Sequence, residues 1–176
     1  SLPGGLRRLQ GAEIVLDCPS VGATETILMA TVLAEGTSTI ENSAKEPEVQ
    51  DLANLLNRMG AKISGAGNST ITIEGVANIC GVTHRVVADR IEAGTFAIAA
   101  GITGGSLTLK QARPRHLDAL IDVLRLTGVD VNELGDDLAV TATGRALAID
   151  IRTDPFPGFP TDLQAQFMAM MCIADG

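Results

Sequence analysis

The feature that most limits the fold of this 176-residue chain is an internal repeat. An apolar, small-residue segment at 21–36 is followed by the β-branched TSTIEN, by the amphipathic segment 47–60 and by two short strand-like pieces. The same order returns from Ala93 at an offset that drifts only between 67 and 71 residues, so that Gly60 corresponds to Gly128. A third copy opens at AIDIRTD and reaches Gly176. Such a period indicates one supersecondary unit per copy.

Within each copy the pattern predicts strand, helix, strand, helix, strand, strand. The second helix is amphipathic and ends at a glycine, Gly60 or Gly128. The first helix is apolar or small almost all round, so it should be buried, and Gly94 and Gly101 would let a neighbouring helix approach closely. The strands alternate polar and apolar residues, as in sheets with one wet face. We therefore predict an α/β chain of repeated βαβαββ units, helices inside and sheets outside, with the third unit truncated.

Composition excludes several classes of function. The net charge of −8 opposes binding to nucleic acid, and an aromatic content of 2% provides few stacking platforms. The apolar runs are too short to span a bilayer. Cys18, Cys80 and Cys172 show neither disulfide-scaffold nor zinc-ligand spacing, so we expect them to be small core or strand residues in a reducing cytoplasm. No nucleic acid, membrane, metal or cofactor is expected.

The candidate functional residues lie at the beginnings of the apolar helices. These beginnings are PSVGAT at 19–24, ADRIEAGT at 88–95 and FPTDLQ at 159–164. If the helices run parallel, their N-termini emerge at one end. Free N–H groups and the helix dipole favour an anion there, so the three ends together could hold phosphate despite the acidic total charge.

Each of these residues also has a purely structural interpretation. Ser20 could be a simple N-cap and Gly22 a packing residue. Thr161 with Gln164 fits a capping box, in which Asp162 merely suits the helix dipole. Of the other candidates, the acidic residues could be solvated carboxylates or a local charge cluster, and the two histidines could be structural: Glu46, Glu48, Asp89, His84 in a strand and His116 at a helix start.

Four motifs in a fixed order resemble one family. DCPSVGATETILMA, ENSAKEPEVQDLANLLNRMGAKISG, DRIEAGTF and FPTDLQAQF together resemble the UDP-N-acetylglucosamine 1-carboxyvinyltransferases, from about Leu6 onward. The resemblance implies an inside-out α/β barrel built from two domains of three units each, with the active site in the cleft between them. Residues 1–87 would be part of the first domain, one unit plus a preceding strand. Residues 88–176 would be part of the second, one full unit and the start of another.

The resemblance also implies a reaction. The enolpyruvyl group of phosphoenolpyruvate moves to the 3′-hydroxyl of UDP-N-acetylglucosamine, phosphate is released, and no cofactor is needed. This is a step of bacterial peptidoglycan synthesis, in the cytoplasm. Asp162 would be the catalytic carboxylate that contacts the attacking hydroxyl. The residues that would bind substrate are Ser20, Val21, Gly22, Thr161 and Asp162, and possible cleft residues are Glu46, Glu48 and Asp89.

Some family features are missing from this sequence. The family's catalytic cysteine follows a PGG sequence, but here Leu6 follows PGG. Cys18 stands where some members carry lysine, and the basic residues that hold phosphoenolpyruvate are absent. We therefore expect the chain alone to be inactive and to need the remainder of a full-length enzyme. Two alternatives stay open: a transferase acting on shikimate 3-phosphate, and a non-catalytic, repeat-built binding module.

Overall fold

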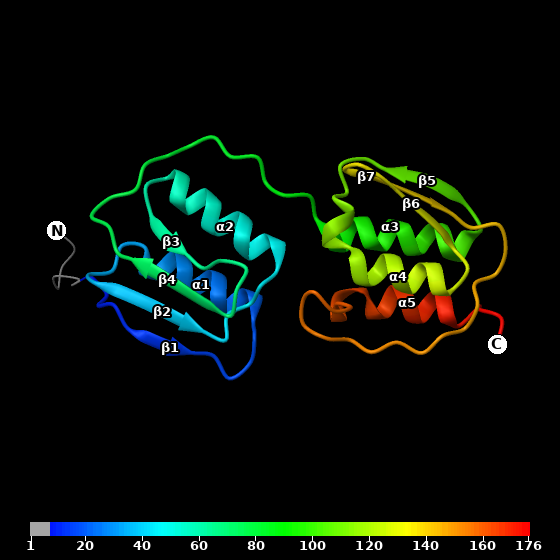
Figure 1. Cartoon of the computed structure of the whole chain (residues 1–176), viewed down its shortest axis with the longest axis horizontal. Helices are drawn as coiled ribbons and strands as arrows, with labels where there is room; N and C mark the ends of the chain where they lie inside the picture. The colour runs from blue at the N-terminus through cyan, green and yellow to red at the C-terminus, as the bar shows by residue number, and fades with distance from the viewer. Residues whose placement is uncertain (1–7) are drawn as a thin grey trace, which may run out of the picture. The chain divides into compact units, whose positions relative to one another are not determined.

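The computed structural model describes residues 8–176, and the chain divides into two compact units, Ser1–Val87 and Ala88–Gly176. Figure 1 shows that each unit combines a β-sheet with helices. The PGG sequence, after which the family's catalytic cysteine is missing, lies outside the described residues. Within residues 8–176, no helix is both long enough and apolar enough to cross a membrane.

The first unit contains one complete βαβαββ repeat. Its elements are β1 (Glu13–Val15), α1 (Val21–Thr31), β2 (Thr37–Glu41), α2 (Pro47–Arg58), β3 (Lys62–Ser64) and β4 (Thr70–Glu74). The strand order is β1-β2-β4-β3, with β1 parallel to β2 and the other pairs antiparallel. The strand–helix pattern predicted for the first copy is therefore confirmed.

The second unit contains an incomplete repeat and the helix of a third. Its elements are α3 (Arg90–Thr103), β5 (Ser106–Leu109), η1 (Pro114–His116), α4 (Asp118–Leu126), β6 (Asp130–Leu134), β7 (Asp137–Thr141), η2 (Thr161–Leu163) and α5 (Gln164–Met171). The sheet is antiparallel in the order β5-β7-β6. Residues 81–89 form no strand, so the predicted opening strand of the second copy, and with it the strand placement of His84, is wrong. Backbone groups of this segment bond to α2 side chains instead of to a sheet.

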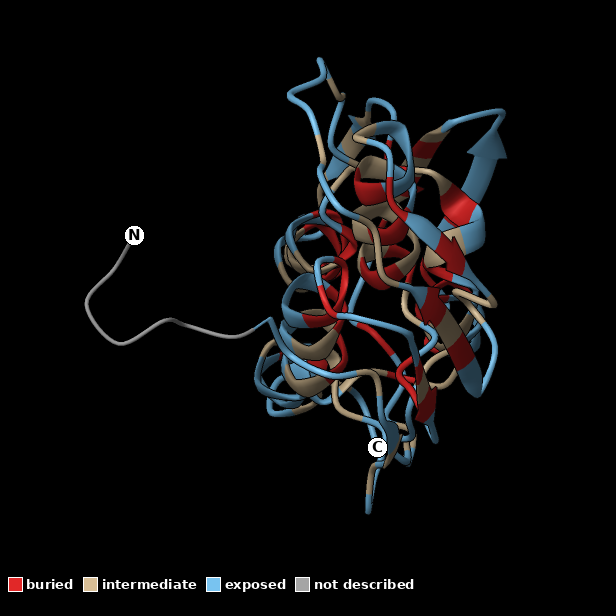
Figure 2. Ribbon diagram, turned by 90° about the vertical axis from the view of Figure 1, so that its left-hand side faces the viewer, coloured by how far each residue is buried: buried red, intermediate tan, exposed pale blue. Residues whose placement is uncertain are grey.

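The core of each unit lies between its sheet and its helices. In the first unit Ile40 faces Ile71 across β2 and β4, and both side chains are fully buried, as is Ile73. In the second unit a fully buried residue of the central strand is Val140 of β7, which pairs with Leu107 and Val131. Buried and exposed residues alternate along the strands in Figure 2. The predicted sheets with one wet face are thus present.

Helix α1 is less buried than its composition predicted. Thr24, Leu28 and Thr31 are buried against the rest of the unit. Met29, however, is 55% exposed and Ala30 is exposed as well. The sheet and α2 cover only one side of α1 within this unit, so an apolar composition all round the helix does not produce burial all round it.

The two copies share one backbone arrangement at the end of their amphipathic helices. Gly60 and Gly128 both adopt positive φ, 108° and 85°, as the predicted C-terminal glycines should. Beyond the following two strands, the chain returns to the same helix end. The N–H of Cys80 donates to the Met59 carbonyl at 2.8 Å, and the N–H of Leu147 donates to the Thr127 carbonyl at 2.9 Å. The repeat therefore extends to individual hydrogen bonds.

Two glycines on α3 let the third-copy helix approach closely. A Cβ placed on Gly94 would lie 2.6 Å from Cδ1 of Leu163, and one on Gly101 would lie 2.9 Å from Sδ of Met170. Real side chains do not approach so closely, so α5 and η2 could not pack as they do against alanine at these positions. The predicted role of Gly94 and Gly101 in helix packing is confirmed.

We expect Gly94→Ala to lower the free energy of unfolding by about 1–3 kcal/mol, because Leu163 must leave its position to admit the methyl group. Gly22→Ala is the matched control, since a Cβ on Gly22 meets no atom within 4 Å. Urea unfolding of both variants measures the difference. Equal stability of Gly94→Ala and the wild type would contradict the packing role.

Candidate functional site

The N-terminus of α1 is capped by Ser20. Its Oγ accepts a hydrogen bond from the N–H of Ala23 at 3.3 Å, and its backbone is extended, with φ −131° and ψ 121°. The capping interpretation of Ser20 is therefore correct. A helix leaves its first N–H groups without partners inside the helix, and this cap serves only that of Ala23. Among residues 8–176 the N–H groups of Val21 and Gly22 have no recorded acceptor, and a Cβ on Gly22 would meet no atom within 4 Å.

A buried threonine ties this helix end to the loop before α2. Thr24 is fully buried; its hydroxyl donates to the Ser20 carbonyl at 2.8 Å and accepts from the N–H of Ala44 at 3.1 Å. Two residues after Ala44, Glu46 begins α2 at the cap position without a side-chain cap, and its Oε2 is buried. Glu48 follows in the first turn and is partly buried. Ser20 and the predicted cleft residue Glu46 thus belong to one connected scaffold.

A third carboxylate of this region, Glu25, was not among the predicted site residues. Burial raises the pKa of the Glu25 carboxyl above its ordinary value, and the negative charge of Glu48 raises it further. Glu25 lies on α1 and Glu48 on α2, so the two carboxylates approach each other across the helices. Because the elements meet only in the folded chain, the sequence alone offered no signal for this pair.

Asp89 caps α3. Its Oδ1 accepts from the N–H groups of Ile91 at 2.8 Å and Glu92 at 3.1 Å. The next residue, Arg90, is buried, and its guanidinium lies 5.7 Å from the ring centroid of Phe156, a cation–π contact. The charge cluster suggested by the sequence is therefore a cap followed by a buried arginine. Arg90 connects the start of α3 to the loop that leads into the FPTD sequence.

Three buried side chains hold the FPTD segment in place. Phe159, Leu163 and Phe167 are at most 4% exposed, and the two phenylalanine rings meet edge to face at 5.6 Å. Thr161 and Asp162 lie between these anchors and are exposed. The backbone on both sides of Asp162 is thus fixed, while its carboxylate faces outward.

The predicted capping box at Thr161 and Gln164 does not form. Pro160 occupies the cap position of η2, Leu163 that of α5, and neither helix has a side-chain cap. Among the described residues, the structure records no hydrogen bond or ion pair to the Asp162 carboxylate. Asp162 therefore does not cap its helix, and its carboxylate oxygens are available to a ligand.

The structure brings the candidate residues together in two groups. Ser20, Val21, Gly22, Glu46 and Glu48 lie in the first unit, joined through Thr24. Thr161, Asp162 and Asp89 lie in the second unit, joined through Arg90 and the contact of Gly94 with Leu163. Sequence reasoning missed Glu25 and the role of Arg90.

The three cysteines do not belong to either group of candidate residues. All three cysteines are exposed, so the prediction that they are core or strand residues is wrong. Over residues 8–176, no three His, Cys, Asp or Glu side chains gather closely enough to hold a metal ion.

The family model described as EPSP synthase (3-phosphoshikimate 1-carboxyvinyltransferase) matches residues 2–176, and the chain belongs to this family. The UDP-N-acetylglucosamine 1-carboxyvinyltransferase of Synechococcus sp. (strain CC9605) is 59% identical over 177 residues, covering all of this chain and 41% of the relative. That of Geobacter metallireducens is 51% identical over 170 residues, covering 97% of this chain and 41% of the relative. The chain thus spans about two fifths of the length of these relatives.

Solved structures show the same fold. The enolpyruvyl transferase NikO from Streptomyces tendae matches with a TM-score of 0.83 at 24% identity, covering 97% of this chain and 43% of that one. EPSP synthase from Acinetobacter baumannii matches with a TM-score of 0.65 at 22% identity, covering 96% of this chain and 40% of that one. The predicted fold class, the inside-out α/β fold of the enolpyruvyl transferases, is confirmed.

Removing the α3 cap should destabilise the second unit. We expect Asp89→Ala to lower the free energy of unfolding by about 1 kcal/mol, because two N–H groups lose their acceptor. Asp89→Asn keeps an acceptor oxygen and should retain most of the stability. Chemical unfolding of the three proteins tests the cap, and equal losses in both variants would show that charge rather than hydrogen bonding matters.

The raised pKa of Glu25 predicts a pH-dependent stability difference. A carboxyl whose pKa is higher in the folded state favours folding only while it is protonated, and this contribution is lost as the pH rises through the folded pKa. We therefore expect the melting temperature of Glu25→Gln, relative to the wild type, to increase between about pH 4 and pH 7. Glu13→Gln, on an exposed strand, reports the general effect of losing one negative charge. A difference that is flat with pH, or equal in the control, would contradict the prediction.

Proposed function

We propose that this chain supplies part of the active site of a UDP-N-acetylglucosamine 1-carboxyvinyltransferase. The observation that carries the proposal is the identity of 51–59% to relatives of that name over 97–100% of the chain. The family description names the 3-phosphoshikimate enzyme, but the solved EPSP synthase shares only 22% identity with this chain. The UDP-sugar is therefore the better supported acceptor.

In the proposed reaction, the 3′-hydroxyl of UDP-N-acetylglucosamine attacks the enolpyruvyl carbon that carries the phosphate. The hydroxyl proton passes to Asp162, and a proton adds to the methylene carbon to give a tetrahedral intermediate. Loss of phosphate together with one proton of the new methyl group then restores the carbon–carbon double bond. The exposed carboxylate of Asp162 has no competing partner among the described residues, and buried neighbours hold its backbone. A carboxylate in hydrogen-bond reach of the hydroxyl can act as general base.

The N-terminus of α1 is the proposed site for the uridine diphosphate part. The N–H groups of Val21 and Gly22 are free to bond phosphate oxygens, and the dipole of this helix favours negative charge. Gly22 leaves room for a close approach. Thr161 would contact the sugar beside Asp162, while Glu46, Glu48 and Asp89 would line the cleft.

The two units are proposed to be portions of two enolpyruvyl transferase domains, 1–87 of the first and 88–176 of the second. The groups that clamp phosphoenolpyruvate and donate the proton would come from the remainder of a full-length enzyme. Such an enzyme would act in the cytoplasm in peptidoglycan synthesis, and thereby in cell wall biogenesis, cell shape and division.

In a full-length transferase carrying this sequence, we expect Asp162→Asn to lower kcat by about 100-fold or more, because the amide cannot accept the hydroxyl proton. Phosphate release from the two substrates measures the rate. Asp122→Asn, on the exposed side of α4, is the control and should leave the rate unchanged. A variant at Asp162 with the wild-type rate would remove Asp162 from the mechanism.

Titration of the isotope-labelled chain discriminates between the acceptors. With UDP-N-acetylglucosamine we expect amide shifts confined to Ser20–Gly22 and Thr161–Asp162. If shikimate 3-phosphate produces these shifts and the UDP-sugar does not, the chain belongs to the sister enzyme. If a full-length protein binds neither compound, the interpretation as a non-catalytic binding module is correct.

A further inference from the structure

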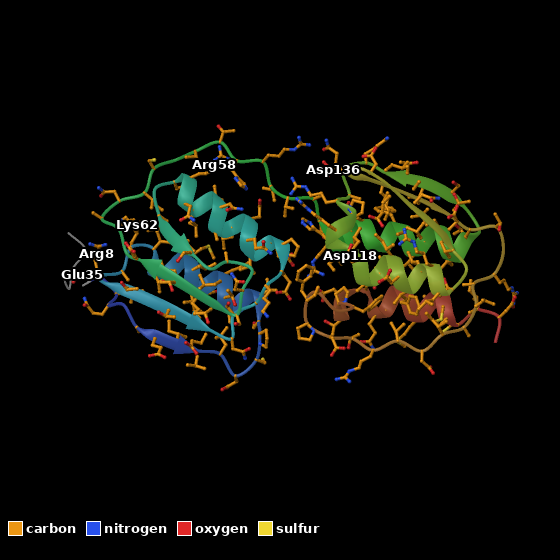
Figure 3. The ribbon with its side chains drawn as sticks, viewed as in Figure 1. Arg8, Glu35, Arg58, Lys62, Asp118 and Asp136 are labelled. Carbon is orange, nitrogen blue, oxygen red and sulfur yellow. The ribbon has the colours of Figure 1, made fainter. Side chains whose placement is uncertain are left out.

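A cluster of three side chains holds the segment that joins the two units. Asp51 and Arg58 lie seven residues apart on α2, two helical turns, and so share one face of the helix. His84 lies between them: its Nε2 is 3.1 Å from Oδ1 of Asp51, and its Nδ1 is 3.2 Å from a terminal nitrogen of Arg58. We call these three residues the connector clamp, and residues 75–88 the connector. Figure 3 labels Arg58 on α2, and Figure 1 shows the connector passing along this helix.

Two further bonds extend the clamp to the connector backbone. The second terminal nitrogen of Arg58 donates to the Thr83 carbonyl at 2.7 Å. The second carboxylate oxygen of Asp51 accepts from the N–H of Val87 at 3.2 Å. The connector is therefore held both before and after His84, and Val87 is the last residue of the first unit.

The donors and acceptors of the clamp fix the tautomer of His84. A guanidinium can only donate, so Nδ1 of His84 must be the acceptor, and the ring proton must be on Nε2, from where it donates to Asp51. The side chains of His84 and Asp51 are only 11% and 20% exposed, so water competes little for these bonds. Both oxygens of Asp51 are occupied by donors from the connector.

The clamp is absent from the second copy of the repeat. At the offset of 68 residues that relates Gly60 to Gly128, Asp51 corresponds to Ala119 and Arg58 to Leu126. The bond from the returning chain to the helix end, by contrast, is present in both copies. A contact that the repeat architecture required would be present in both copies. The clamp therefore serves the connector between the units and not the architecture of the repeat.

We propose that Asp51 and His84 are positioning residues, which anchor the connector to the first unit as far as Val87. The next anchor along the chain is Asp89, whose carboxylate caps α3. Ala88 is then the single residue between the two anchors, so the freedom of the joint is confined to the backbone dihedrals around it. The clamp fixes the chain two residues before the proposed cleft residue Asp89. Only this link to the cleft depends on the proposed function.

Backbone dynamics of the 176-residue chain test the clamp without any substrate. In the wild type we expect NMR order parameters of residues 83–87 near 0.85, about the value of rigid backbone. In Asp51→Asn an NH2 group, which cannot accept a hydrogen bond, replaces one carboxylate oxygen. His84 and Val87 then compete for the one remaining oxygen. We expect the Val87 amide to exchange with solvent about ten-fold faster, while the Cys80 amide, bonded to Met59, stays unchanged.

A spectroscopic signature separates the clamp from a general stabilising effect. The ¹⁵N shifts of the His84 ring should show the proton on Nε2 in the wild type and a mixture of tautomers in Asp51→Asn. The exposed Asp122→Asn should change neither the ring shifts nor the Val87 exchange. The proposal is overturned if residues 83–87 are mobile in the wild type, or if His84 carries its proton on Nδ1. These two measurements need no variant, and failure in either leaves the proposed transferase activity unaffected.

Discussion

The close approach of α3 to η2 and α5 determines where the candidate general base lies. Leu163, adjacent to Asp162, packs against Gly94. Met170 packs against Gly101, which lies seven residues further along α3. A second tie is the hydrogen bond from the Gln166 amide to the Thr95 hydroxyl at 3.0 Å. Asp162 is thus exposed on a backbone that is not free to move. Such fixed placement is what a catalytic group needs, because small displacements from the reacting geometry cost much of the rate.

The electrostatics of the first unit limit what this chain can bind unaided. The N–H groups of Val21 and Gly22 are the proposed anion site, but burial and, to a smaller extent, the negative charge of Glu48 raise the pKa of the nearby Glu25. A diphosphate at this helix end would meet their negative field as well as the attraction of the helix dipole. Cationic side chains from the remainder of a longer enzyme would balance that field and make the binding tighter than that of this chain alone. This agrees with the expectation that the chain alone is not a complete catalyst.

Features that depend on neighbouring residues in the chain could be predicted from the sequence. The glycines that end the amphipathic helices, the alternating strands and the small residues of α3 follow from local pattern, and all were found. One local pattern failed, the capping box at Thr161 and Gln164, and other errors concern partners far away in the sequence. His84 was assigned to a strand because Asp51, 33 residues earlier, cannot be recognised as its partner before the chain folds. The burial of α1 was overestimated for the same reason, since composition does not show which faces are covered.

Comparison of the three equivalent helix beginnings separates capping from chemistry. Ser20 caps α1 and Asp89 caps α3, but the corresponding position of the third copy is Pro160, which has no side-chain acceptor. One carboxylate oxygen of Asp89 therefore accepts hydrogen bonds from two backbone N–H groups. The carboxylate of Asp162, two residues beyond Pro160, accepts none from the described residues. Of these two carboxylates, only Asp162 has both oxygens without a hydrogen bond among the described residues. The chemical difference between the copies thus arises from which position at the helix beginning carries the acid.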